Sequence, residues 1–122
     1  MSGKFASMLK RIRLRHGVTL REFCLKNGFD PGNYSRLERG LFPPPENHEL
    51  LERYAIALGI KPGSDEWLEL FDFAAAERGR IPDDIMSDKE VVDKLPVFFR
   101  TIRGKPLTSD QLTELVEKIR RS

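Results

Sequence analysis

TLREFCLKNGFDPGNYSRLERG, residues 19–40, contains the start and stop signals of two consecutive helices. Thr19 stands three residues before Glu22, which is the spacing of a capping box at the start of a helix. Gly28 ends that helix, because glycine adopts the positive φ that other residues resist. Asp30 then caps a second helix, and Pro31 fits its first turn, where no backbone N–H is needed. The stretch predicts a helix, a four-residue turn and a second helix.

The spacing of small and apolar residues predicts that these two helices cross at a steep angle. Cys24 is small enough to lie where they touch, and Gly28 allows the sharp turn. Phe29, Tyr34 and Leu37 are spaced to lock the second helix onto the first. The opposite face of the second helix, residues 31–39, is then free to enter a DNA major groove, which is about as wide as a helix.

The rest of the chain is also predicted to be helical, since no segment shows sustained period-2 alternation. Phe5, Met8, Leu9 and Ile12 form one apolar stripe, which predicts a helix over about residues 5–15. We expect an all-α protein with a five-helix domain at 1–80 and a helical region at 81–122. Two later helices are expected at about 46–58 and 65–78. A further helix is expected to begin at a capping box, Ser87–Glu90, and to kink or restart at Pro96. The last helix is expected to begin at another capping box, Thr108–Gln111.

Several other residues have structural interpretations. The three prolines at 43–45 predict an extended loop, Asp83 and Asp84 a solvated loop, and Gly104-Lys105-Pro106 a turn. Cys24 is expected to be a small buried hydrophobe. We interpret His16 and His48 as surface residues.

The charge is distributed unevenly along the chain. The 122 residues are 33% charged with a net charge of +2. Residues 1–40 carry nine Lys and Arg against three Asp and Glu, whereas residues 41–80 carry four against eight. A basic segment joined to an acidic one suggests a part that binds a polyanion, although a solvated helix face is the ordinary alternative.

Composition also argues against other classes of protein. A single cysteine excludes an intrachain disulfide and a multi-cysteine metal site. No apolar run approaches the roughly 18–20 residues of a membrane span, and no signal peptide is evident, so we expect a cytoplasmic protein without membrane contact. Since no phosphate loop, nucleophile motif or zinc spacing occurs, we expect no enzyme, no cofactor and no metal.

Residues 9–59 resemble the XRE/Cro/C1-type helix-turn-helix family of phage and bacterial repressors. This resemblance covers less than half of the chain and implies a lambda-repressor-like fold. It also implies a sequence-specific transcriptional regulator, a repressor that acts as a dimer on a two-fold operator through helix 31–39. The matching residues are Leu9, Arg13, Gly17-Val18-Thr19, Glu22-Phe23-Cys24, Gly28-Phe29, Ser35-Arg36-Leu37-Glu38-Arg39-Gly40, Leu51 and Ala55-Ile56-Ala57-Leu58-Gly59-Ile60.

The resemblance implies a role for individual residues. Asn33 would pair with an adenine edge and Arg36 with guanine. Ser35 would reach a phosphate or a base, whereas Tyr34 would belong to the core and Glu38 would bond within the domain. The groove-facing positions would be Pro31, Gly32, Asn33 and Arg36, and the residues near phosphates would be Thr19, Arg21 and Arg39.

Two positions depart from the family pattern. Leu20 stands where the family often has a glutamine that braces the recognition helix and touches a phosphate. Pro31 and Gly32 stand where long polar residues are common, and they offer few hydrogen bonds to bases. Sequence preference would then depend on Asn33, Arg36 and DNA shape.

The C-terminal region leaves two interpretations open. Its apolar residues could build a helical dimer interface, or they could complete one intramolecular core. An alternative function is an antitoxin or a peptidase-controlled repressor, whose C-terminal part binds a toxin or carries a segment at 79–87 that a metallopeptidase partner cleaves. The capping boxes favour a folded region over a disordered tail. The candidate interface residues are Phe98, Phe99, Ile102, Leu112, Leu115, Val116 and Ile119.

Overall fold

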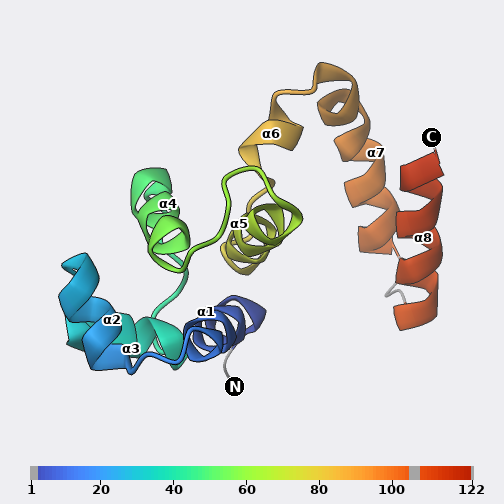
Figure 1. Ribbon diagram of the computed structural model, residues 1–122. Coiled ribbons are helices and arrows are strands. Elements are labelled where there is room, and N and C mark those ends of the chain that lie inside the picture. Colours follow the sequence, from blue (N-terminus) through green and yellow to red (C-terminus); the bar gives the residue numbers. More distant parts are fainter. Residues whose placement is uncertain (1–2, 105–107, 122) are drawn as a thin grey trace. The chain divides into compact units, whose positions relative to one another are not determined.

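The computed structural model describes residues 3–104 and 108–121, apart from the side chains at 115 and 118–121. Over these ranges the chain is helical with no strand, as the sequence predicted. It divides into two compact units, Met1–Pro82 and Asp83–Ser122 (Figure 1). Within the described ranges, no helix has both the length and the apolar character that a membrane span requires.

The first unit contains five helices over its described residues. The fourth begins later than the predicted residue 46, because Asn47 caps it by accepting a hydrogen bond from the Leu50 backbone N–H at 3.0 Å. The helices are α1 (Lys4–Arg15), α2 (Leu20–Asn27), α3 (Pro31–Glu38), α4 (His48–Ala57) and α5 (Asp65–Glu77).

The turn between α2 and α3 is built from local side-chain bonds. The Thr19 hydroxyl accepts from the Glu22 N–H at 3.1 Å, and the Asp30 carboxylate accepts from the Asn33 N–H at 3.1 Å. Gly28 follows α2 with a φ of +72°, a left-handed conformation that disfavours other residues. Three residues, not the predicted four, separate the helices, since Asn27 still belongs to α2.

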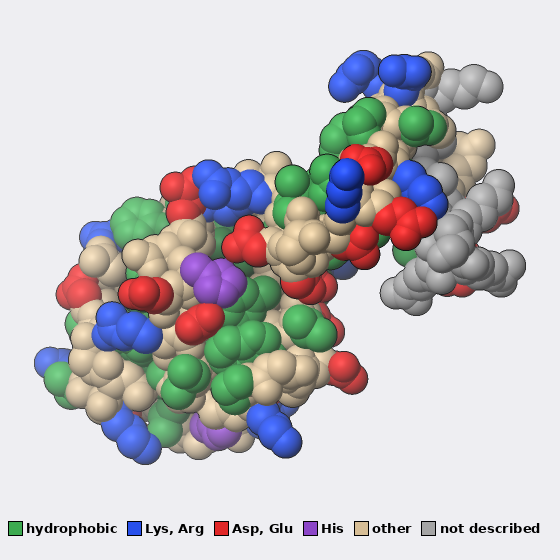
Figure 2. All heavy atoms as spheres, turned by 90° about the horizontal axis from the view of Figure 1, so that it is seen from above, with side chains coloured by type: hydrophobic (Ala, Val, Ile, Leu, Met, Phe, Trp, Pro, Cys, Tyr) green, Lys and Arg blue, Asp and Glu red, His purple; other side chains and the backbone are tan. Residues whose placement is uncertain are grey.

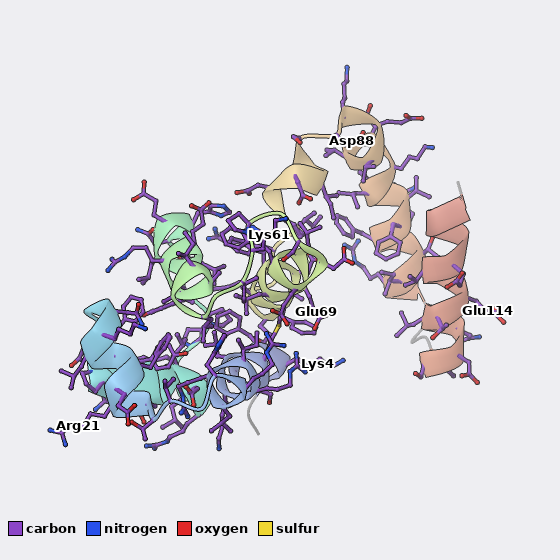
Figure 3. The ribbon with its side chains drawn as sticks, viewed as in Figure 1. Lys4, Arg21, Lys61, Glu69, Asp88 and Glu114 are labelled. Atoms are coloured by element: carbon purple, nitrogen blue, oxygen red, sulfur yellow. The ribbon has the colours of Figure 1, made fainter. Side chains whose placement is uncertain are left out.

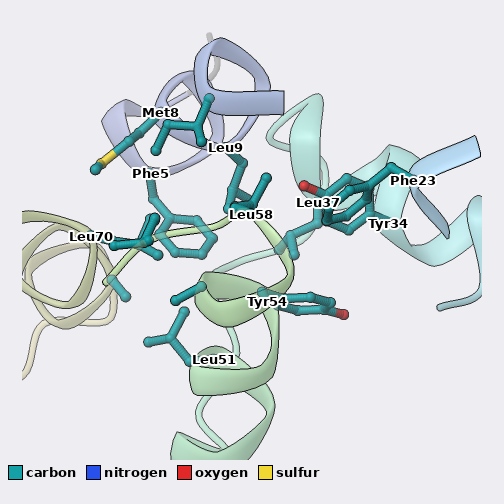
Figure 4. Packing of buried hydrophobic residues seen from close by; sticks show 14 of the residues in the cluster. Phe5, Met8, Leu9, Phe23, Tyr34, Leu37, Leu51, Tyr54, Leu58 and Leu70 are labelled. Atoms are coloured by element: carbon teal, nitrogen blue, oxygen red, sulfur yellow. The ribbon is translucent and has the colours of Figure 1, made fainter. Parts of the chain in front are cut away.

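The core of the first unit lies where α1 meets the other helices (Figure 4). The predicted stripe of α1 is almost completely buried, and so are Cys24 and Tyr34. Burying one large apolar side chain contributes roughly 1.5–3 kcal/mol, so this shared core fixes the helices relative to one another. The residues of the stripe are Phe5, Met8, Leu9 and Ile12.

The second unit corrects two predictions about its first turns. Asp83–Met86 forms the short helix α6, where a solvated loop was expected, because Pro82 precedes it and two acidic residues favour its first turn. Ser87 does not cap the next helix. Its N–H bonds the Asp83 carbonyl, whereas the Asp88 carboxylate accepts from the Glu90 and Val91 N–H groups at 3.1 and 3.3 Å.

The two longer helices of this unit are α7 (Lys89–Gly104) and α8 (Ser109–Arg121). Pro96 lies inside α7 and does not restart it, since the φ of proline suits a helix and only one backbone N–H is lost. The capping box of α8 is confirmed. The Thr108 N–H donates to Gln111 Oε1 at 3.0 Å, and the Gln111 N–H donates to Thr108 Oγ1 at 3.2 Å. Of the predicted turn, Gly104 belongs to α7, while Lys105 and Pro106 lie outside the described residues.

Candidate nucleic-acid interface

Helix α3 has one locked face and one exposed face. Tyr34, Leu37 and Glu38 are buried against the rest of the first unit. The other face points to solvent, and Ser35 lies half-buried at its edge. Thr19 and Arg21, at the start of α2, are exposed as well. The exposed residues on or next to α3 are Pro31, Gly32, Asn33, Arg36 and Arg39.

A buried ion pair holds α3 on α1. The Arg13 guanidinium donates to both Glu38 carboxylate oxygens, from Nε at 2.8 Å and from Nη2 at 2.7 Å. A third bond runs from Arg13 Nη1 to the Val18 carbonyl at 2.8 Å, just before α2 begins. These bonds to Glu38 raise the pKa of Arg13 above its ordinary value. The structural role expected for Glu38 is therefore confirmed.

An aromatic cluster fixes the turn between α2 and α3. The Phe29 ring meets the Tyr54 ring edge-on at 4.7 Å between centroids. Phe23 lies 5.0 Å from Tyr34, which in turn meets Tyr54 at 5.5 Å. Such pairs contribute about 0.5–1.5 kcal/mol beyond the area that they bury. The turn is therefore attached to α4 as well as to its own helices.

The Arg36 side chain has a defined place on the exposed face. Its guanidinium carbon lies 5.6 Å from the centroid of the Phe42 ring, a cation–π contact. A Cβ added to Gly32 would lie 3.6 Å from Arg36 Nη1, so the guanidinium lies over the preceding turn of α3. The Leu41 and Phe42 N–H groups both donate to the Arg36 carbonyl, at 2.8 and 3.3 Å. Sequence reasoning missed Phe42, and its only signal was an aromatic residue just after the helix-ending glycine.

Ion pairs cancel much of the positive charge of α1. Arg15 pairs with Glu66 at 2.9 Å and lowers the pKa of that carboxyl, and Arg11 lies 3.8 Å from Glu69 on the side of α5 that faces α1 (Figure 3). Among the described residues, the cations of α2 and α3 have no such carboxylate partner, and Arg21 extends into solvent (Figure 3). These cations are Arg21, Lys26, Arg36 and, just after α3, Arg39.

His16 and Cys24 have structural roles, whereas His48 is exposed, as expected. Cys24 is completely buried, and burial raises the pKa of its thiol. His16 is exposed, as expected, but its Nε2 also lies 2.7 Å from the Leu58 carbonyl, a bond that the sequence did not suggest. A hollow of about 850 Å³ lies beside α2, and its Arg13 and His16 are both engaged in these bonds.

Five of the seven predicted dimer residues have described side chains, and each of the five is exposed or half-buried. Hydrophobic side chains are visible on the surface of the second unit in Figure 2. Phe98 and Ile102 are half-buried, whereas Phe99, Leu112 and Val116 are 42%, 43% and 47% exposed. No described side chain of this unit is fully buried. The side chains of Leu115 and Ile119 lie outside the described residues.

No protein-family model, no curated protein and no solved structure matches the chain. Function is therefore inferred from the exposed face of α3 and the charge around it.

Proposed function

We propose that the first unit binds double-stranded DNA by placing the exposed face of α3 in the major groove. The chain would then be a sequence-specific transcriptional regulator, a repressor of the XRE/Cro/C1 type with a lambda-repressor-like domain. One observation carries this proposal. Arg11, Arg13 and Arg15 of α1 pair with carboxylates, whereas the Lys and Arg residues of α2 and α3 have no carboxylate partner among the described residues. The buried face of α3 is held against the core and by the ion pair between Glu38 and Arg13, so the position of its exposed face is fixed.

Two exposed side chains of α3 have the chemistry for direct base contacts. Asn33 and Arg36 are three residues apart, so they share one side of the helix. A guanidinium donates two hydrogen bonds to the major-groove edge of guanine, and an amide both donates to and accepts from adenine. Each such contact discriminates against a wrong base by about 1–3 kcal/mol.

The neighbouring residues would position the domain on the DNA backbone. Arg21 and Arg39 supply charge for phosphates on either side of the groove, and each phosphate neutralised releases counterions. Thr19 already accepts the Glu22 N–H, so its hydroxyl retains a proton to donate to a phosphate oxygen. Ser35, half-buried at the edge of the face, is within the same zone.

The rest of the face offers little hydrogen bonding. Pro31 has no polar side chain, and Gly32 has no side chain at all. Leu20 is half-buried against the core and cannot brace α3 through a polar bond. We therefore expect a short set of directly recognised bases, with further preference from the shape of the groove.

The test begins with selection of bound sequences from a pool of random duplexes. Fluorescence anisotropy then compares a selected duplex with a scrambled one. Arg36→Ala and Asn33→Ala should each weaken binding to the selected duplex about 5–150-fold, the equivalent of 1–3 kcal/mol, and affect the scrambled duplex much less. Arg11→Ala removes the same charge from α1, where Glu69 partners it, and serves as the matched control.

Two outcomes would contradict the proposal. The first is a pool that yields no enriched sequence together with no measurable binding to any duplex at low salt. The second is an Arg11→Ala loss equal to the Arg36→Ala loss, which would assign binding to bulk charge and not to the α3 face.

A further inference from the structure

We infer that the exposed face of α3 reads a methyl group together with a guanine. The base on the 5′ side of the guanine bound by Arg36 is a thymine or a 5-methylcytosine, and its C5-methyl packs on the face of the guanidinium that Phe42 leaves open. This assignment rests on the proposed DNA binding by α3, and it names the two-base step that the face selects.

The Arg36 guanidinium is positioned before any DNA is bound. Its carbon lies 5.6 Å from the centroid of the Phe42 ring. The Phe42 backbone is attached to the same residue, because its N–H donates to the Arg36 carbonyl at 3.3 Å, after Gly40 turns the chain with a φ of +75°. Guanidinium and ring therefore belong to one local unit, and less side-chain entropy is lost when Arg36 binds a base.

The guanidinium has one covered face and one open face. A ring that covers one side of a planar group leaves the opposite side free. Gly32 lies next to the guanidinium and adds no side chain there, since a Cβ at this position would stand 3.6 Å from Arg36 Nη1. Arg36 also has no carboxylate partner within the described ranges. Its N–H donors are thus free for a base, and its open face is free for an apolar group.

The geometry of B-DNA decides which group meets the open face. Two hydrogen bonds to O6 and N7 bring a guanidinium into the plane of the guanine. The next base along the strand is stacked about 3.4 Å away, and the C5 position of a pyrimidine on the 5′ side projects into the major groove over the guanidinium. A guanidinium is weakly hydrated, so a methyl group on its face displaces little bound water. Thymine and 5-methylcytosine carry this methyl group, whereas cytosine does not.

The residues around the guanidinium suit a methyl group better than a polar one. Phe42 is 43% exposed, and Leu41, whose N–H also bonds the Arg36 carbonyl, is 59% exposed. On the exposed face of α3, Pro31 and Gly32 offer no polar side chain. A neighbouring base with an amino or keto group at this place would lose hydrogen bonds to water and gain no side-chain partner from these residues. A methyl group loses none.

Fluorescence anisotropy of the full chain on the selected duplex tests the inference. The guanine bound by Arg36 is the one whose replacement weakens binding by the wild type but not by Arg36→Ala. The base on its 5′ side is then varied in two pairs, thymine against deoxyuridine and 5-methylcytosine against cytosine, which differ only in the methyl group. We expect the methylated member of each pair to bind about 3–5-fold more tightly, the effect of burying one methyl group.

Four variants test the positioning roles of Phe42 and Gly32. Phe42→Ala releases the guanidinium and should reduce the methyl preference to below about 1.5-fold, whereas Phe42→Tyr keeps the ring and the preference. Gly32→Ala places its Cβ in ordinary contact with Arg36 and should keep the preference. Gly32→Leu extends into the open space and should abolish it. Circular dichroism confirms that each variant retains its helices.

The possible failures are distinguishable. A wild-type chain that binds the selected duplex tightly, but with equal affinity for both members of each pair, would overturn the inference and leave the proposed function intact. A methyl preference that survives in Phe42→Ala and Gly32→Leu would equally overturn it, because the preference would then arise elsewhere. A chain that enriches no sequence refutes the proposed function, and this inference with it.

Discussion

Replacing Glu38 with alanine should destabilise the first unit strongly, although no apolar contact is removed. The side chains of Arg13 and Glu38 are only 8% and 4% exposed, and two bonds of 2.8 and 2.7 Å join them. Without Glu38 the guanidinium stays in the core with only the Val18 carbonyl as a partner. Leaving one member of a buried pair uncompensated costs about 3–5 kcal/mol.

That cost is large beside the total stability of a domain, typically about 5–15 kcal/mol. For a unit of this size each kcal/mol lowers Tm by roughly 4–8 °C, so Glu38→Ala should lower Tm by about 12 °C or more. Urea and thermal unfolding, followed by circular dichroism, measure both quantities.

The double variant Arg13→Met, Glu38→Leu separates charge from packing. Replacing a buried pair by apolar residues is often neutral or stabilising, so the double variant should recover most of the loss. A Glu38→Ala change below about 1 kcal/mol, or a double variant no better than Glu38→Ala, would refute the role assigned to the pair.

Three further predictions concern other parts of the chain. The stability of the first unit should fall as pH rises above about 9. Burial raises the pKa of Cys24, Tyr34 and Tyr54 above their values in the unfolded chain, so the unfolded chain releases these protons first. Urea midpoints measured from pH 7 to 10.5 check this, and a midpoint that does not change with pH contradicts it. Phe42→Ala should weaken binding to a selected DNA duplex about 2–5-fold by releasing the Arg36 guanidinium, whereas Phe42→Tyr should not, as anisotropy would show. Pro96→Ala should raise the helical circular dichroism signal and stabilise α7, since it restores the N–H that bonds the Val92 carbonyl; a loss of helix would indicate that Pro96 is needed for packing.

Local signals in the sequence predicted most of the helices. The caps at Thr19, Asp30 and Thr108 depend on residues three positions apart, so their bonds are encoded within one turn. The apolar period of α1 likewise identified its buried side. Helix α6 was missed, because a single turn is too short to show a period.

The contacts that position the candidate site were harder to predict, because they join residues distant in sequence. Glu38 was expected to bond within the domain, but nothing local identified Arg13, 25 residues away, as its partner. The same holds for His16 and the Leu58 carbonyl, 42 residues apart. Phe42 follows α3 closely, yet its contact with Arg36 depends on how the chain turns after Gly40.

The charge of the first unit is unevenly distributed over its helices. Among the described residues, the cations of α2 and α3 have no carboxylate partner, whereas residues 41–80, which include α4 and α5, carry twice as many acidic as basic residues. In the field of a polyanion such a body experiences a torque that turns its positive end forward before contact. Fewer encounters would then be wasted in the wrong orientation. The acidic helix α5, which lies far from the proposed groove contacts, would thus increase the rate of association, and this increase would disappear at high ionic strength.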